Sequence, residues 1–385
     1  MDKRLLLLRG GMVEPMTGAG ARRADILCGN GKIERISERV ELPESAAVRI
    51  LDASGCLVLP GLIDAHCHVG VTEEKKGTEG DDCNENTEPV MPWLRGLDAV
   101  NMMDAAFGDA VRAGITSVMT GPGSSNPVGG QFVFLKTSGR RADEAALLAP
   151  AAMKVAFGEN PKANFSGMGI TPVTRMGIAG LLRRELFAAR AYCRERAAGR
   201  GEEKFELEPW RPVFERKIPL KAHVHRVDDI FTAMRIAEEF GLDMTLDHCS
   251  EGHLIADHIA RSRFPAIVGP DLTCRNKIEV QNMNFKTAGV LYGAGVPVAI
   301  CTDHPVSLIS CLPLCAGLAV KAGLPMRAGL QAITSSPAKI CRVFHRVGSL
   351  EEGKDADIAV FSGNPMETFT VTRYTIIDGE VEYRG

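Results

Sequence analysis

The stretch Val58-Leu59-Pro60-Gly61-Leu62-Ile63-Asp64-Ala65-His66-Cys67-His68 carries the strongest structural signal in the chain. It is an apolar run with a Pro-Gly step that ends in two histidines two residues apart, and such a run predicts a buried strand. Alternate side chains of a strand share one face, so His66 and His68 point the same way, with Cα atoms roughly 6–7 Å apart. Both imidazoles can therefore reach one metal ion.

Three further apolar runs end in residues of the same kind. Pro219–His225 closes on a second His-x-His pair, Thr245–His248 closes on a histidine, and Val298–His304 closes on Asp303 followed by a histidine. Six of the nine histidines lie in these four places. This clustering predicts that the ends of several strands meet around one metal site.

Strand-like runs alternate with helical patterns over most of the chain. Strands are expected at 115–119, 132–135, 151–157, 218–225, 244–248, 265–269 and 297–302, and helices at 176–198 and 230–240, among others. Strict alternation of this kind predicts parallel βαβ units, which build either a doubly wound sheet or an eight-stranded barrel. We favour the barrel, because the candidate polar residues follow many different strands and barrel active sites lie at the C-terminal ends of the strands.

The two ends of the chain share a different pattern. Short apolar stretches broken by turns, such as Gly29-Asn30-Gly31, run from Leu5 to Val58, and the last forty residues repeat this rhythm with a turn at Asp378-Gly379. We expect hairpins at both ends that pair into one small sheet domain. Leu5–Leu8 is too short for a signal peptide or a membrane span and is better explained as a buried strand.

The composition excludes several classes of partner. The chain has 385 residues, of which 45% are hydrophobic and 24% charged, and its net charge is −3. A near-neutral surface argues against nucleic acid or a membrane surface as a partner. Eleven cysteines without a CxxC pair fit free thiols in a reducing cytoplasm. We expect a cytoplasmic protein that acts on a small molecule, as a homo-oligomer.

The motifs resemble those of the amidohydrolase superfamily. The segment 60–68 looks like its first-strand signature, and 334–339 followed by 348–357 is similar to its return into a C-terminal β-sandwich. The segments 123–131, 156–162 and 302–305 resemble the imidazolonepropionase-related branch. The resemblance covers essentially the whole chain. It implies a (β/α)8 TIM-type barrel over residues 59–344, with a small β-sandwich domain from 1–58 plus 345–385.

The resemblance also implies roles for individual residues, and it implies one or two divalent metal ions, with zinc favoured. The implied metal ligands are His66, His68, Lys154, His223, His248 and Asp303. Lys154 occupies the place of a carboxylated lysine that bridges two metals, because a carbamate offers two oxygens where an ammonium offers none. His225 shares a face with His223, so it is either the ligand of the fifth strand instead or a substrate contact.

The implied reaction is hydrolysis of a C–N amide bond by a metal-bridged hydroxide, with Asp303 as the proton shuttle. The substrate would be a cyclic amide, an amino-acid-derived amide or a dipeptide. Candidate substrate contacts are Asn84, in the long polar loop Thr72–Glu88, and three cations that suit a carboxylate, Arg226, Arg275 and Lys277.

Two alternatives are a mononuclear deaminase and an imidazolonepropionase-like ring hydrolase. Deaminating relatives carry a glutamate three residues after the fifth-strand histidine. Counting from His223, that place holds Arg226, which argues against deamination; counting from His225, it holds Asp228, which leaves the alternative open. A barrel that has lost catalysis would have lost ligands, and the full set is present here.

Overall fold

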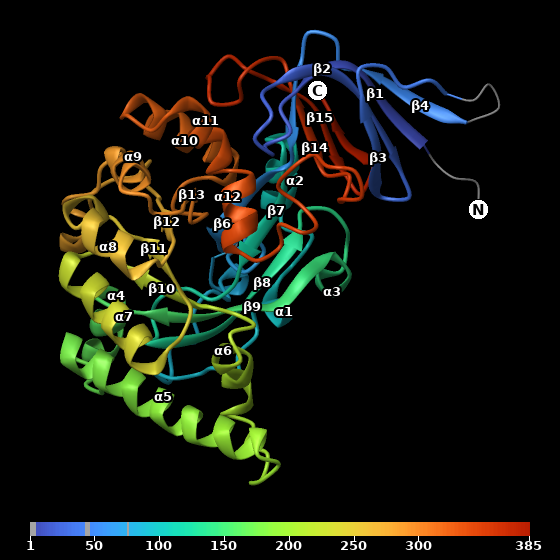
Figure 1. Cartoon of the computed structure of the whole chain (residues 1–385). Coiled ribbons are helices and arrows are strands. Elements are labelled where there is room, and N and C mark those ends of the chain that lie inside the picture. The colour runs from blue at the N-terminus through green and yellow to red at the C-terminus, as the bar shows by residue number, and fades with distance from the viewer. Residues whose placement is uncertain (1–4, 43–46, 75–76) are drawn as a thin grey trace.

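The computed structural model describes residues 5–42, 47–74 and 77–385 (Figure 1). Positions 75–76 of the polar loop Thr72–Glu88 therefore lie outside the described residues. Within the described residues, no helix is both long enough and apolar enough to cross a membrane. All eleven cysteines are free thiols.

Eight strands form the central sheet, in the spatial order β13-β12-β11-β10-β9-β8-β7-β6. They are β6 (Leu62–Cys67), β7 (Ile115–Thr120), β8 (Val128–Lys136), β9 (Ala146–Ala156), β10 (Leu220–Val224), β11 (Met244–His248), β12 (Ala266–Val268) and β13 (Val298–Ile300). The sheet curls until its first and last strands almost meet. The Asp303 N–H, just past β13, donates to the carbonyl of His66 at 3.0 Å, and the His68 N–H donates to the carbonyl of His304 at 2.8 Å. The sheet is thus a nearly closed barrel.

The expected strict βαβ alternation is wrong at one strand. β8 pairs antiparallel with both β7 and β9, whereas the other neighbouring pairs of the barrel are parallel. A parallel connection needs a crossover of a dozen or more residues. Residues 121–127 and 137–145, which flank β8, are too few for one, so the chain turns back on itself at both ends of β8.

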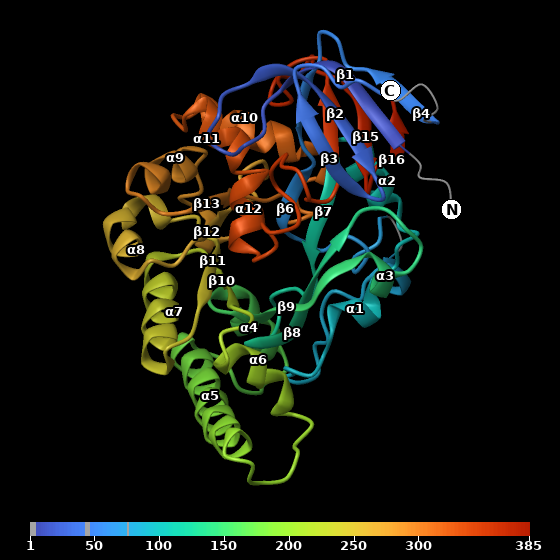
Figure 2. The ribbon, with the colours of Figure 1, turned by 45° about the vertical axis from the view of Figure 1, so that its right-hand side comes forward.

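Helices cover the outside of most of the barrel (Figures 1 and 2). They are α1 (Gly96–Ala99), α2 (Ala105–Arg112), α3 (Ala142–Ala145), α4 (Glu159–Gly167), α5 (Arg175–Ala197), α6 (Arg211–Phe214), α7 (Val227–Phe240), α8 (Ala256–Ser262), α9 (Lys286–Gly293), α10 (Leu312–Lys321), α11 (Met326–Gln331) and α12 (Ser335–Ile340). The helices expected at 176–198 and 230–240 correspond to α5 and α7. The Thr174 hydroxyl caps α5 by accepting from the Gly177 N–H at 3.0 Å.

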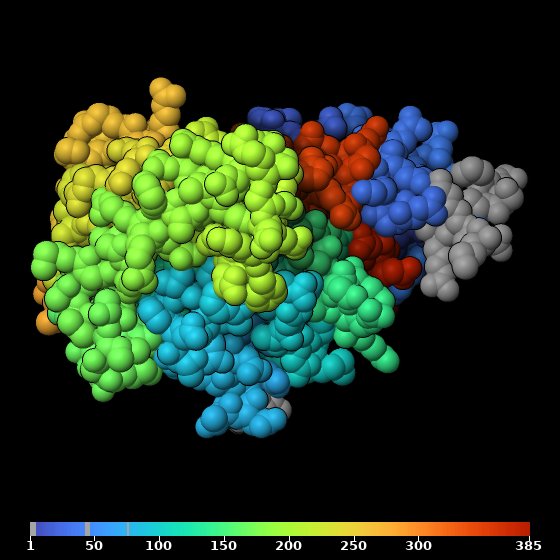
Figure 3. Space-filling view, turned by 90° about the horizontal axis from the view of Figure 1, so that it is seen from below, coloured from blue at the N-terminus to red at the C-terminus, as the bar shows by residue number. Residues whose placement is uncertain are grey.

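Both ends of the chain enter one second sheet, with the path β16-β15-β14-β5-β1-β2-β3 and β4 paired to β1. Its strands are β1 (Leu5–Val13), β2 (Arg22–Gly29), β3 (Lys32–Ser37), β4 (Val48–Asp52), β5 (Leu57–Pro60), β14 (Ile358–Phe361), β15 (Thr372–Ile377) and β16 (Glu380–Arg384). The N-terminal and C-terminal halves of this sheet meet where β5 pairs antiparallel with β14. The space-filling view shows these two chain ends packed together beside the barrel (Figure 3).

Each sheet has its own buried core. The largest cluster packs the barrel strands against the helices, and a separate cluster that includes Leu8, Ile26 and Ile358 fills the small sheet. A third cluster includes Phe132, whose ring centroid lies 5.3 Å from that of His66. Phe132 therefore forms part of the floor beneath the polar residues described next.

Candidate metal centre at the mouth of the barrel

The predicted ligands lie at the C-terminal ends of five barrel strands. His66 and His68 come from the end of β6, Lys154 from β9, His223 and His225 from β10, His248 from β11, and Asp303 from the residues after β13. Seven of the barrel strands run in one direction, so these ends share one mouth. Only β8 runs the other way, and it supplies none of the predicted ligands.

A first group of possible ligands consists of His66, His68 and Asp303. One oxygen of Asp303 lies 3.4 Å from His66 Nε2 and 3.2 Å from His68 Nε2. Lys154 is fully buried, and its Nζ lies 3.3 Å from His66 Nε2. Asp303 has a φ of 52°, a left-handed conformation that is uncommon outside glycine and that is retained mainly at functional sites.

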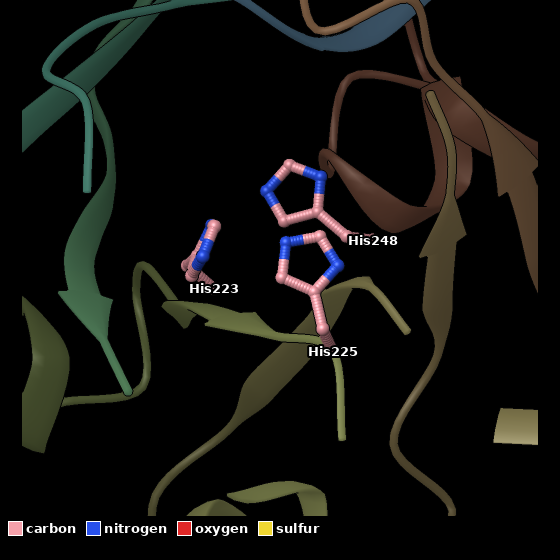
Figure 4. Close-up of side chains that lie close together, drawn as sticks. All are labelled: His223, His225 and His248. Atoms are coloured by element: carbon pink, nitrogen blue, oxygen red, sulfur yellow. The ribbon is translucent and has the colours of Figure 1, made fainter. Parts of the chain in front are cut away.

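A second group consists of His223, His225 and His248, all of them buried (Figure 4). The rings of His225 and His248 are stacked at 16°, and His223 stands nearly edge-on to His225, with ring centroids 4.6 Å apart. His248 also has a positive φ, of 69°, which turns its side chain at the end of β11. Both histidines of the β10 pair thus lie in this group, and the geometry does not choose between them as ligands.

Hydrogen bonds to Nδ1 orient four of these five rings. His68 and His248 bond to the carbonyls of Gly121 and Gly269, both at 2.8 Å, and a carbonyl can only accept. Their Nδ1 atoms must therefore carry a hydrogen, which leaves Nε2 of each ring to face a metal. Burial lowers the pKa of His68, but Cys83 and Asp303 outweigh it and raise that pKa to about 10, so His68 must lose its Nε2 proton when a metal binds. His66 Nδ1 lies 2.6 Å from Asp247, and His225 Nδ1 lies 2.8 Å from the Ser250 hydroxyl.

His223 is the exception. Neither of its buried ring nitrogens has a hydrogen-bond partner among the residues that the structure describes. A buried imidazole without partners is costly unless something else satisfies it. This orphaned ring, together with the Nε2 lone pairs of its neighbours, fits a site built for a metal ion.

Burial and charge set the protonation of the site. Burial lowers the pKa of His66, His223 and His248 well below the ordinary range, and it lowers the pKa of His225 to about 4. These rings are neutral, as metal ligation requires. Burial raises the pKa of Asp303, but His248 and His68 outweigh it and bring that pKa to about 2. The Asp303 carboxylate is therefore ionised at neutral pH.

Three supporting residues were not among the predicted site residues. Asp247 accepts from His66 and lies 2.9 Å from the buried Lys221, whose Nζ also donates to the carbonyl of Ala65. Asp64 accepts from the N–H of His66. Asp64 lies two residues before His66, and Asp247 lies one residue before His248. A charged residue inside an apolar run beside a predicted ligand was therefore the sequence signal that could have identified these supporting residues.

A cavity of about 460 Å³ opens above both groups, a size that suits one small molecule. Its lining includes Lys154, His68, His223, His225, His248 and Asp303, with Asp81, Asn84 and Lys277 among the other polar residues. Asn84 thus lies at the cavity, where it accepts from the Ser125 N–H at 3.0 Å. Residues 72, 81, 83 and 84 of the long polar loop also line it.

The two predicted arginine contacts lie elsewhere. Arg226 forms a paired contact with Asp228 at 3.0 and 3.2 Å, and Arg275 donates to the carbonyl of Met283. Neither arginine is among the residues that line the cavity. The third predicted cation, Lys277, does line the cavity, and it donates to Asn160 at 2.6 Å.

Asp228 also lies away from the cavity lining. Its carboxylate faces Arg226 and is half exposed, so it does not reach the histidines in the way a deaminase acid would. The arrangement therefore gives no support to the mononuclear deaminase.

Comparisons with known proteins point to one enzyme family. A family model described as "Amidohydrolase family" matches residues 214–381. The crystal structure of an amidohydrolase from Thermotoga maritima MSB8 is 38% identical, with a TM-score of 0.94 over 99% of this chain and 100% of that one.

Two curated proteins are more distant relatives. A dihydroorotase of Pelotomaculum thermopropionicum is 25% identical over 99% of this chain and 94% of its own length. The amidohydrolase tasK of Hapsidospora irregularis is 28% identical over 93% of this chain, which spans 40% of tasK. The fold and the two ligand groups support a metal-dependent hydrolase, and the chain belongs to the amidohydrolase family of enzymes.

Proposed function

We propose that this enzyme hydrolyses a C–N amide bond in a small substrate, with divalent metal ions, Zn²⁺ first among them, held by the six predicted ligands. The observation that carries the proposal is the pair of three-residue ligand groups that border one cavity together with the buried Lys154. We further propose membership of the imidazolonepropionase-related branch, and a small β-sandwich domain of residues 1–58 plus 345–385 beside a catalytic barrel of residues 59–344.

The surroundings of Lys154 support its carboxylation. The neighbouring buried Lys221 has a carboxylate partner, Asp247, at 2.9 Å. Lys154 has no carboxylate within 4.0 Å among the described parts of the chain, although it is fully buried. Burial lowers the pKa of Lys154 to about 8, which increases the fraction of neutral amine, the form that reacts with CO₂. The resulting carbamate would supply the oxygen ligands that an ammonium cannot.

The chemistry divides between the metal and the chain. Bound divalent metals lower the pKa of water from 15.7 to about 7 and polarise a carbonyl oxygen. Asp303, ionised and facing the cavity, takes the proton from the attacking water and delivers it to the leaving nitrogen. The products are a carboxylate and an amine, or a single ring-opened acid when the amide is cyclic.

The cavity lining supports an amino-acid-derived amide, a dipeptide or a cyclic amide. Lys277 donates to Asn160 at 2.6 Å and to Glu279 at 3.2 Å, and it lies in the lining beside the histidines, where its ammonium would also attract a substrate carboxylate. Asn84 and Asp81 lie in the same lining and can accept from an amine or amide N–H. The cavity thus combines anion-binding and hydrogen-bonding groups around the ligand groups.

The test combines metal analysis with a hydrolysis screen of dipeptides, N-acyl amino acids, hydantoins and lactams. We expect about two metal ions per wild-type chain. Lys154→Ala should lose one of these ions. Its activity should fall by more than the roughly 10- to 100-fold that is typical when an outer-shell partner of a metal ligand is removed. Lys162→Ala, an exposed change on α4, is the matched control and should keep both. Unchanged metal content in Lys154→Ala would exclude the bridging role of this lysine.

A further inference from the structure

The second ligand group has a buried carboxylate beside it that belongs to none of the predicted ligands. Glu279 lies in the short 3₁₀ helix Ile278–Val280 after β12, and it is 1% exposed. Its Oε1 lies 3.8 Å from His223 Nε2 and 3.8 Å from His225 Nε2. One oxygen therefore faces two of the three histidines at the same distance.

These distances suit atoms that share one metal ion. Ligand atoms at about 2.0–2.2 Å from a tetrahedral zinc lie about 3.3–3.6 Å from one another, a few tenths of an ångström less than the separation seen here. His223 adds an independent observation, because both of its buried ring nitrogens lack a partner among the described residues. A buried lone pair without a donor beside a carboxylate oxygen suits a cation between them, in addition to the Lys277 ammonium that already lies 3.2 Å from that oxygen.

Glu279 is held in place by groups outside the histidine cluster. Its Oε2 accepts from the Glu159 N–H at 2.8 Å, at the start of α4, where a carboxylate also interacts favourably with the helix dipole. Lys277 lies 3.2 Å from its Oε1. Gly158, the residue before Glu159, has a φ of 84°, and a Cβ at that position would lie 2.8 Å from Glu279 Oε2. The backbone is shaped so that this carboxylate can approach.

We propose that Glu279 is a ligand of the metal ion held by His223, His225 and His248. The inference rests on the proposed function and extends it: this ion then has a carboxylate ligand beside His223 and His225 and can be held without the Lys154 carbamate. The first group, His66, His68 and Asp303, is the one that depends on Lys154.

The test is a Zn²⁺ titration of chelator-stripped full-length protein in competition with a chromophoric chelator, and Co²⁺ absorption reports the coordination. Glu279→Gln keeps an acceptor for the Glu159 N–H and should bind one of the two ions at least tenfold more weakly, with a changed Co²⁺ spectrum. Glu251→Gln is the matched control, because Glu251 is also buried and accepts from a backbone N–H, that of Val227, at 2.8 Å. It should bind both ions as the wild type does.

A second pair of variants tests independence from the carbamate. Lys154→Ala should keep one ion near the wild-type affinity, and the double variant with Glu279→Gln should hold that ion at least tenfold more weakly. Unchanged affinities in Glu279→Gln, or loss of both ions in Lys154→Ala, would overturn the inference and leave the proposed function standing. A wild-type chain that binds neither Zn²⁺ nor Co²⁺ would instead remove the proposed function.

The outcome does not depend on one variant folding. Glu279→Asp keeps the charge but shortens the side chain by one carbon, which withdraws the oxygens from the histidines. If Glu279→Gln does not fold, the aspartate variant should show the same weakening, and wild-type affinity in it counts against the ligand role.

Discussion

At the scale of single residues, the Asp247 carboxylate contacts three different side chains beside the first ligand group. One of its oxygens lies 2.6 Å from His66 Nδ1 and 2.9 Å from Lys221, and the other accepts from the Thr245 hydroxyl at 2.7 Å. An acceptor on Nδ1 fixes the ring and makes Nε2 a better ligand. Asp247 is thus a positioning residue for His66.

We predict that Asp247→Asn lowers metal affinity by roughly 10- to 100-fold, the range for outer-shell partners of ligating histidines. Thr245→Ala removes only the hydroxyl bonded to the far oxygen and should have a much smaller effect. A chelator-competition titration of both variants measures this. Equal affinities in Asp247→Asn and the wild type would show that His66 does not need this partner.

Asp271, after β12, gives a prediction about pH. Its Oδ1 is buried without a partner among the described residues, and burial raises its pKa from the ordinary 3.8 to about 7. A raised folded-state pKa contributes stability that is complete below pH 3.8 and is lost as the pH rises through 7. Asp271→Asn should therefore gain unfolding free energy relative to the wild type at pH 8, and the gain should shrink at pH 5. Urea titrations at the two pH values measure it, and a gain independent of pH would refute it.

At the scale of elements, the closure of the barrel rests on side chains where the strand ladder ends. Asp64 on β6 accepts from the N–H of Thr302 at 3.0 Å and from its hydroxyl at 2.6 Å, and it also accepts from the His66 N–H. It therefore joins the ends of β6 and β13 and orients ligands on both.

We predict that Asp64→Ala lowers the free energy of unfolding by at least about 3 kcal/mol, because it leaves three buried donors without an acceptor at about 1–3 kcal/mol each, and that it also weakens metal binding. Asp25→Ala is the comparison, since Asp25 accepts from the N–H groups of Gly10 and Val40 in the small sheet. It should destabilise the chain without changing metal affinity. Denaturant unfolding and metal titration of the two variants separate these effects.

The elements also show how much of the secondary structure the sequence pattern predicted. The expected strands and the two long expected helices correspond to observed elements, because apolar runs of strand length and helical periodicity are local properties. The direction of β8 was missed. Its apolar residues read as a strand in either direction, and only the short flanking connections, with the turn-rich residues 121–127, decide that it runs antiparallel.

At the scale of the whole molecule, the predicted ligands tie five strands of the barrel together. A bound ion that the unfolded chain does not hold stabilises the fold by mass action, by about 2.7 kcal/mol at a free concentration of 100 times Kd. We predict that a chelator lowers the melting temperature of metal-loaded protein and that added Zn²⁺ restores it. Calorimetry with and without the chelator measures this. A melting temperature that changes neither with chelator nor with added Zn²⁺ would contradict the prediction.

The sequence by itself determined the strand that ends in His66 and His68, and the set of residue types able to bind metal. These depend on local order: alternation along a strand places both imidazoles on one face whatever the rest of the chain does. Tertiary structure alone decided which polar residues share a cavity. It placed Lys277 in the lining and Arg226 and Arg275 outside it, and it brought Glu279 beside His223 and His225. The composition of the cavity lining depends on the path of the loops between strands and on contacts between segments distant in the sequence. Local sequence patterns do not contain this information.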